Sequence, residues 1–167
     1  GHCISVDPCF LVAAAPEITR LMRTAREVND AKPHYVVKHI AQLAKQFSDP
    51  VIGCLGLTYK ADVDDLRESP SLEIVEALHQ HGAGTVLACD PYISEERFTD
   101  FPLHTLEEVL AKSQILVLLT DHKQFLSIPI NHQIATFALG RHRCPRPPGL
   151  TGLHAFEPRC VPTISIN

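Results

Sequence analysis

Three short apolar runs alternate with helix-like segments in the middle of the chain, and this alternation constrains the fold more than any other feature of the sequence. The runs are residues 51–59, 85–89 and 115–119, and turn-forming residues bound each of them. Continuous apolar runs of this length are typical of strands buried on both faces of a parallel sheet. The pattern therefore predicts an α/β fold of βαβαβ order, built on an open parallel sheet.

The segments between these strands carry helix signals. Ser69 and Pro70 supply an N-cap and a first-turn proline for a helix that closes at Gly82, and a shorter helix is expected over residues 106–112. Open parallel sheets bind their ligands at the carboxyl ends of the strands. We expect these ends to lie together, at residues 59–60, 90–91 and 120–122.

A long helical segment precedes the first strand. Apolar residues with three-and-four spacing give residues 17–30 one apolar face, and the spacing resumes after Pro33. Pro33 either begins a second helix or kinks a continuous one, and the helical stretch is expected to end near residues 48–50. The chain is accordingly divided into residues 1–48, 49–137 and 138–167.

The last 30 residues differ in composition from the rest of the chain. They hold eight prolines and glycines, four arginines and one glutamate, and we interpret this tail as irregular and similar to out-of-frame sequence. Four possible zinc ligands lie there without a Cys-x-x-Cys spacing, so no metal site is predicted. These residues are His142, Cys144, His154 and Cys160.

Composition excludes several classes of protein. The formal net charge of -4 argues against a nucleic-acid binder. No apolar run approaches the roughly 20 residues that span a bilayer, and no secretion signal opens the chain, so a cytoplasmic protein without membrane partners is expected. The six cysteines are scattered without a Cys-x-x-Cys pair and are interpreted as free thiols.

Cys3 is the first candidate for chemistry. It follows His2 and precedes Asp7 by four residues. A nearby positive charge or a helix amino end favours the thiolate, which is the nucleophilic form, and a carboxylate orients a proton carrier or a water molecule. The alternative is that Cys3 is a small core residue.

The second candidate is the charged loop over residues 60–70, which joins a buried strand to a helix amino end, where anions bind. Lys60 and Arg67 can contact phosphate, while Asp64 and Asp65 can hold those cations or a hydroxyl group. A solvated charged loop is the alternative. The glycines of the first strand do not form the full G-x-G-x-x-G fingerprint, so this sheet is not predicted to grip a dinucleotide.

Three motifs in this order resemble the UDP-glucose/GDP-mannose dehydrogenase family. They are GHCISVDP at residues 1–8, RTAREVND at 23–30 and GLTYKADVDDLRESP at 56–70. Within the family they are most similar to the branch that acts on UDP-N-acetyl-D-mannosamine. The resemblance covers residues 1–137 and implies a Rossmann-like UDP-binding domain after the end of a helical dimerisation region.

The resemblance also implies an activity. Members of the family use NAD to oxidise the sugar 6-hydroxyl to a carboxylate in two steps, through a cysteine thiohemiacetal and thioester, and the mannosamine branch makes a uronic acid for surface polysaccharides. Cys3 matches the cysteine, and Asp7 matches an aspartate that positions water or an assisting lysine. Tyr59 and Lys60 fall in the substrate-binding segment, and Arg67 matches an arginine on the cofactor side.

The resemblance places residue 1 in the family's middle region, so an amino-terminal NAD domain is expected to be missing and these residues alone to be inactive. A homodimer through the helical region is expected. The family's closing strand and its V-[VI]-D-x-[RK]-G segment are not found after residue 137. Two alternatives stay open, namely another sugar, UDP-N-acetylglucosamine or UDP-glucose, and a UDP-sugar-binding or dimerisation module without catalysis.

Overall fold

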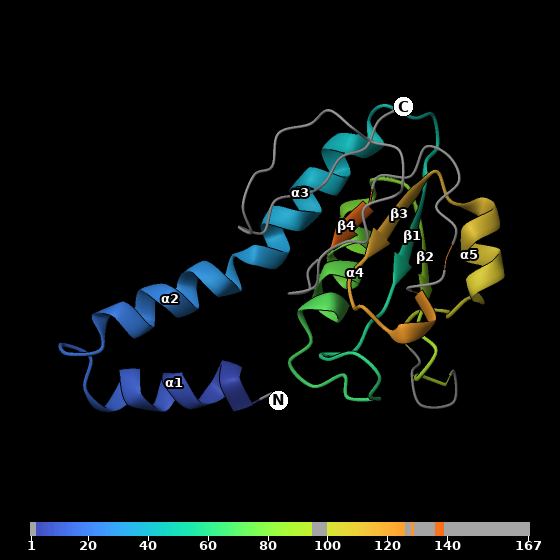
Figure 1. The fold of residues 1–167 in the computed structure, drawn as a ribbon. Helices are drawn as coiled ribbons and strands as arrows, with labels where there is room; N and C mark the ends of the chain where they lie inside the picture. The colour runs from blue at the N-terminus through green and yellow to red at the C-terminus, as the bar shows by residue number, and fades with distance from the viewer. Residues whose placement is uncertain (1–2, 95–99, 126–127, 129–135, 139–167) are drawn as a thin grey trace, which may run out of the picture.

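The computed structural model describes residues 3–94, 100–125, 128 and 136–138 and contains a parallel sheet at its centre. Its strands are β1 (Val51–Leu55), β2 (Thr85–Cys89), β3 (Ile115–Leu118) and β4 (Thr136–Ala138). They lie in the order β2-β1-β3-β4, and all pairs are parallel (Figure 1). The predicted α/β class and βαβαβ order are therefore confirmed.

The strands differ from the sequence prediction at their ends. The first run becomes a strand only as far as Leu55, and its last residues form the start of a loop. The edge strand β4 was not predicted, because a three-residue strand is too short to show a period in the sequence. It pairs with β3 and adds an outer edge to the sheet.

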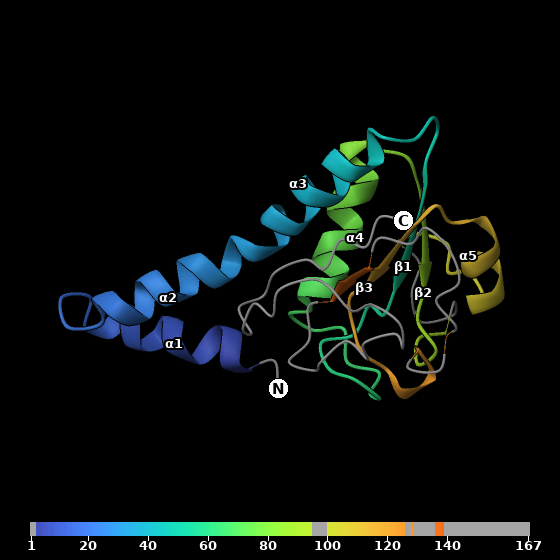
Figure 2. The same cartoon turned by 45° about the horizontal axis from the view of Figure 1, so that its top comes forward.

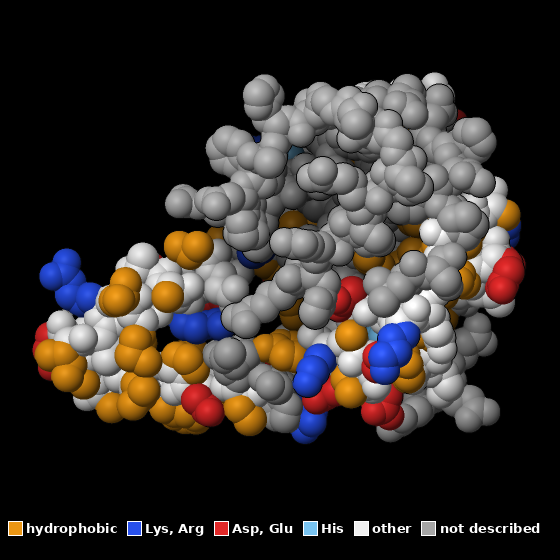
Figure 3. All heavy atoms as spheres, viewed as in Figure 1, with side chains coloured by type: hydrophobic (Ala, Val, Ile, Leu, Met, Phe, Trp, Pro, Cys, Tyr) orange, Lys and Arg blue, Asp and Glu red, His pale blue; other side chains and the backbone are white. Residues whose placement is uncertain are grey.

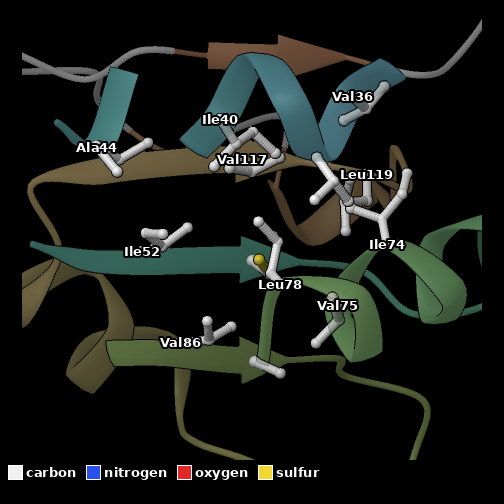
Figure 4. Packing of buried hydrophobic residues seen from close by; sticks show 14 of the residues in the cluster. Val36, Ile40, Ala44, Ile52, Ile74, Val75, Leu78, Val86, Val117 and Leu119 are labelled. Atoms are coloured by element: carbon white, nitrogen blue, oxygen red, sulfur yellow. The ribbon is translucent and has the colours of Figure 1, made fainter. Parts of the chain in front are cut away.

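Helices cover both faces of the sheet. α3 (Lys32–Ala44) and α4 (Pro70–His81) lie on one face, and α5 (Leu106–Lys112) lies on the other (Figure 1). Figure 4 shows Ile40 of α3 against Val117 of β3, and Ile74 of α4 beside Leu119, which follows β3; all four side chains are buried. Each such side chain contributes about 1.5–3 kcal/mol on burial. This double cover explains why the strands are continuously apolar.

Local signals set the bounds of α4 and α5. The Ser69 hydroxyl accepts a hydrogen bond from the amide of Leu72, and Gly82 ends α4 with a φ of 66°, as the sequence predicted. At α5, Thr105 and Glu108 form a reciprocal capping box. Both helices are thus placed by residues that can be recognised in the sequence.

The helices before the sheet are α1 (Cys3–Ala14), α2 (Arg20–Asp30) and α3. Pro33 lies in the first turn of α3, so a second helix is the correct alternative. The last α-helix of this stretch ends at Ala44 rather than near residues 48–50. After it, the amides of Gln46 and Phe47 bond to carbonyls three residues back, as in a 3₁₀ turn, instead of four. α1 was not predicted, because it contains Pro8 and its apolar residues do not repeat with a 3.6-residue period.

α1 and α2 form an arm that projects from the sheet, as Figures 1 and 2 show from two directions. No residue of α2 is buried. Leu21 is 82% exposed and Val28 70% exposed, and Figure 3 shows hydrophobic side chains along this part of the molecule. We call the exposed apolar side chains of this region the arm surface, and they are Val6, Phe10, Leu11, Ile18, Leu21 and Val28.

Within the described residues, no helix combines the length and the apolar character needed to cross a bilayer.

Candidate functional site

The carboxyl ends of β1, β2 and β3 meet through buried polar side chains. His122, after β3, places Nε2 3.1 Å from Oδ2 of Asp90, which follows β2. The same nitrogen lies 3.3 Å from the hydroxyl of Thr58, which follows β1. All three residues are buried. The expectation that these three chain segments lie together is therefore confirmed.

This edge is also where the strand order reverses. From β1 the chain passes to β2 on one side, then crosses back over β1 to β3 on the other side. Connections that diverge in this way place the topological switch point of the sheet between β1 and β3, where open α/β sheets bind their ligands. The loop after β1 begins at this switch point.

The loop between β1 and α4 presents two cations. Lys60 and Arg67 are both exposed. Arg67 makes a bidentate pair with Asp65, through Nε at 2.8 Å from Oδ1 and Nη2 at 3.0 Å from Oδ2. The prediction that an aspartate of this loop holds one of its cations is thus confirmed for Asp65. Tyr59 is half-buried, and its amide donates to the carbonyl of Asp65 across the loop.

Two residues of this loop have left-handed backbone conformations, Asp62 with a φ of 61° and Glu68 with a φ of 54°. Such angles cost free energy for residues other than glycine, and they persist where the surroundings hold them. Asp62 is held by its surroundings, since its Oδ1 accepts from the Tyr92 hydroxyl and from the amide of Lys123, both at 3.1 Å. These contacts keep the pKa of Asp62 below its ordinary value, and the hydrogen bond from the Lys123 amide is the largest cause.

The amino end of α4 closes the loop. The Ser69 hydroxyl donates to the carbonyl of Leu57 at 2.6 Å, in addition to capping the helix. The first amides of α4 therefore lie at the same edge as Lys60, and a helix amino end favours anions.

Cys3 and Asp7 lie one helical turn apart at the start of α1, and both are exposed. The interpretation of Cys3 as a core residue is therefore wrong. Figures 1 and 2 place the amino end of α1 beside the loop that precedes α4. Hydrogen bonding to Asp65 is the main cause of a raised pKa at Arg67, and Cys3 makes a smaller contribution. Cys3 thus lies within electrostatic range of that guanidinium group.

The cysteines of the strands differ from Cys3. Cys54 and Cys89 are buried in β1 and β2. Burial raises the pKa of Cys54 to about 12. Burial, followed by the charges of Asp90 and Glu107, raises the pKa of Cys89 to about 11. Neither thiol is therefore suited to act as a nucleophile.

Gly53 in β1 and Gly56 just after it do not form a cradle for a dinucleotide. A Cβ on Gly53 would collide with Ser113 and with Val109, because β1 packs closely on α5 there. A Cβ on Gly56 would lie 2.5 Å from the Cβ of Thr120. Both positions are therefore filled by protein atoms rather than open to a ligand.

Other candidate regions contribute less. A hollow between α1 and α2 is lined by Cys9, Arg23 and Arg26, among others, and includes neither Lys60 nor Arg67. The described part of the chain contains no group of three metal-ligating side chains. The four tail residues considered as zinc ligands, and the tail itself beyond Ala138, lie outside the described residues.

The meeting of the three strand ends was predicted from the sequence, but the polar network that joins them was not. Thr58, Asp90 and His122 each follow a buried strand within a few residues. Buried polar groups in such positions need partners, and parallel strand ends provide them. Polar residues directly after buried strands were therefore the signal that could have predicted this network. The pairing of Asp62 with Tyr92 has no such signal in the sequence.

An open parallel sheet that carries a loop with two exposed cations and a helix amino end at its switch point is typical of nucleotide-binding α/β domains. Residues 53–139 match the UDP binding domain of the UDP-glucose/GDP-mannose dehydrogenase family. The chain belongs to this family.

Several known proteins are similar to the chain. It is 54% identical to an NDP-N-acetyl-D-galactosaminuronic acid dehydrogenase of Ralstonia nicotianae, over 75% of this chain and 30% of that protein. It is 44% identical to the UDP-N-acetyl-D-mannosamine dehydrogenase of Escherichia coli, over 75% of this chain and 32% of that protein. The chain thus spans about a third of the length of these relatives.

Solved structures agree in fold. The UDP-N-acetyl-mannosamine dehydrogenase Cap5O from S. aureus superposes with a TM-score of 0.70 at 36% identity, covering 83% of this chain and 33% of that one. A UDP-glucose dehydrogenase from Pyrobaculum islandicum superposes with a TM-score of 0.72 at 20% identity, covering 83% of this chain and 33% of that chain, which shows a shared fold.

Proposed function

We propose that the chain is the carboxyl-terminal part of an NAD-dependent UDP-N-acetylhexosamine 6-dehydrogenase, and that its loop between β1 and α4 binds the UDP-sugar. The observation that carries the proposal is the position of Cys3. The exposed thiol of Cys3 begins α1, and the amino end of α1 lies beside the loop that precedes α4 and carries Lys60 and Arg67 (Figures 1 and 2). This arrangement supports a nucleophile beside a bound substrate.

Three residues at this loop have proposed roles. Lys60 and Tyr59 contact the substrate, and the amino end of α4 together with Lys60 offsets the charge of the diphosphate. Arg67 lies nearer the cofactor. It exchanges part of its pairing with Asp65 for a ligand contact, because a bidentate guanidinium group binds carboxylate and phosphate in similar ways.

The chemistry at Cys3 follows from its reactivity as a thiolate. Oxidation of the 6-hydroxyl gives an aldehyde, and the sulfur of Cys3 adds to it to form a thiohemiacetal. A second two-electron oxidation gives the thioester, and attack of water releases the carboxylate and the thiol. Asp7 is one turn away and exposed, which supports a role in positioning that water.

NAD, when bound, would accept a hydride in each of the two oxidation steps, so that two NAD molecules are used for each carboxylate formed. Gly53 in β1 and Gly56 just after it are packed against Ser113, Val109 and Thr120 and do not fit a dinucleotide, so the cofactor is held mainly by other parts of the whole protein. Among the residues described here, only Arg67 is assigned to the cofactor side. Residues 1–167 alone are accordingly expected not to oxidise the substrate.

Two N-acetylhexosamines are candidate substrates. The three motifs favour UDP-N-acetyl-D-mannosamine, and the product would then be the mannosaminuronate used in surface polysaccharides. The 54% identity to an NDP-N-acetyl-D-galactosaminuronic acid dehydrogenase favours the galactosamine sugar instead. The rates at which the complete enzyme oxidises these two UDP-sugars decide between them. UDP-N-acetylglucosamine and UDP-glucose are tested alongside as the other candidate substrates.

We also propose that the arm surface forms part of a homodimer interface. Ile18, between α1 and α2, and Leu21, in α2, are more than 80% exposed, and the other side chains of the arm surface lie on α1 and α2. Contiguous exposed apolar surface of this kind marks a protein interaction site.

Activity of the protein translated from the complete reading frame tests the proposed function. Cys3→Ala is expected to lower carboxylate formation by roughly a thousandfold or more, because it removes the nucleophile. Cys9→Ala is the matched control, since Cys9 is also exposed on α1, and it should leave the rate unchanged. An unaltered rate of carboxylate formation in Cys3→Ala would contradict the mechanism. If the unsubstituted protein oxidises none of the UDP-sugars, the binding module without catalysis is favoured instead.

A further inference from the structure

The His122 ring links the loop between β1 and α4 to the carboxyl ends of the strands beneath it. Its Nδ1 accepts a hydrogen bond from the backbone amide of Asp62 at 2.9 Å. Its Nε2 faces Asp90 and Thr58. The ring is buried, and it packs against Tyr92 at 4.9 Å and Phe125 at 5.4 Å between ring centroids. Packing on both sides therefore fixes its orientation.

The hydrogen bonds also fix the tautomer of His122. Because an amide donates to Nδ1, this nitrogen carries no proton, and the proton lies on Nε2. Nε2–H then donates to the carboxylate of Asp90. The Thr58 hydroxyl uses its own proton to donate to the carbonyl of Lys60 at 3.0 Å, so its oxygen can also accept from His122. Every donor in this cluster has an acceptor.

The consequence is that Lys60 is held from both sides. Its carbonyl accepts from Thr58, and two residues later the amide of Asp62 is bound to His122. The carboxylate of Asp62 is bound in turn by Tyr92 and by the amide of Lys123. The backbone around the exposed Lys60 is thus hydrogen-bonded to residues that follow β1, β2 and β3.

We infer that His122 is a positioning residue for nucleotide binding, which fixes the backbone of Asp62 and thereby the place of Lys60 at the nucleotide edge. The inference rests on the proposed function, because it assigns a purpose to a loop that binds UDP. Because His122 is fully buried, its effect on binding passes through the loop. A loop that already has its bound conformation loses less conformational entropy when the ligand binds, and this strengthens binding.

Two substitutions separate the contacts of the ring. In His122→Asn, the side-chain oxygen can take the place of Nδ1 and accept from Asp62, but the contact with Asp90 is lost. In His122→Gln, the side-chain amide can take the place of Nε2 and donate to Asp90, but the loop contact is lost. Both variants leave one buried group without its partner, so each is expected to lose stability.

The test is a UDP titration of residues 1–167, followed by amide chemical shifts and by hydrogen exchange of the Asp62 amide. His122→Gln should weaken UDP binding by about fivefold or more and speed exchange at Asp62. His122→Asn should keep both close to the unsubstituted values. The free energies of unfolding of the two variants are measured alongside, because a purely structural role predicts that UDP affinity follows stability in both.

Tyr92→Phe provides a second route that leaves the buried ring in place. It removes only the hydroxyl that donates to Asp62, and it should raise the UDP dissociation constant by about twofold. Equal affinities in His122→Asn and His122→Gln would overturn the inference and leave the proposed function intact. If His122→Gln does not fold, unchanged UDP affinity and Asp62 exchange in Tyr92→Phe would overturn it. No UDP binding to the unsubstituted chain would overturn both.

Discussion

At the scale of single residues, the buried carboxylate of Asp90 organises the ligand edge. Burial raises the pKa of Asp90, but hydrogen bonds from His122 and from the amides of Leu57 and Tyr92 outweigh burial and leave the pKa below its ordinary value. The Leu57 amide is 2.7 Å from Oδ2, and the Tyr92 amide is 2.9 Å from Oδ1. The charged form of Asp90 is thus favoured by folding.

This lowered pKa predicts a pH dependence of stability. A carboxyl group with a folded pKa below its unfolded value of about 3.9 stabilises the protein above that pH, and the contribution is lost as the pH falls toward the folded pKa. Asp90→Asn should cost roughly 2–3 kcal/mol of unfolding free energy at pH 7 and less at pH 3. Urea unfolding at both pH values measures this, with the exposed Asp7→Asn as control. A cost that does not change with pH would contradict the account.

The four described cysteines provide a second prediction at this scale. Cys3 is exposed, while Cys54 and Cys89 are buried with raised pKa values. Iodoacetamide should therefore alkylate Cys3 before the two strand cysteines, as peptide mapping by mass spectrometry can show. Cys9 is exposed as well and is replaced by serine so that α1 carries one thiol. Faster labelling of Cys54 or Cys89 would count against the proposed site.

At the scale of elements, helix caps and strand runs were predicted from sequence because each has a local cause. Ser69, Gly82 and the apolar runs act within a few residues. The arm surface is different, since three-and-four spacing predicts an apolar face without saying what covers it. α2 has such a face, and it is exposed in this chain.

The arm surface should make the chain associate. Light scattering is expected to give a mass that rises with concentration, and Leu21→Asp should shift the chain toward monomer without lowering its free energy of unfolding, because Leu21 is 82% exposed. Thr24→Asp, also at an exposed position of α2, is the control for added charge. A strict monomer at high concentration would rule out the interface.

At the scale of the whole molecule, the sequence predicts which strand ends meet, because parallel topology brings them to one edge. It does not predict how the groups at that edge are paired. The bond from the Asp62 amide to His122 joins residues 60 positions apart and depends on a left-handed backbone at Asp62. The position of Cys3 beside the loop likewise depends on how the arm folds back, which no local pattern determines.

The most direct test of the account is where UDP binds. A titration of residues 1–167 should give roughly millimolar affinity, with the largest amide shifts over residues 59–68. Lys60→Ala should weaken binding, while Lys112→Ala, which removes an exposed charge on α5, should not. Shifts confined to residues 138–167, with Lys60, Asp64 and Arg67 unchanged, would show that the nucleotide binds elsewhere and would contradict the account.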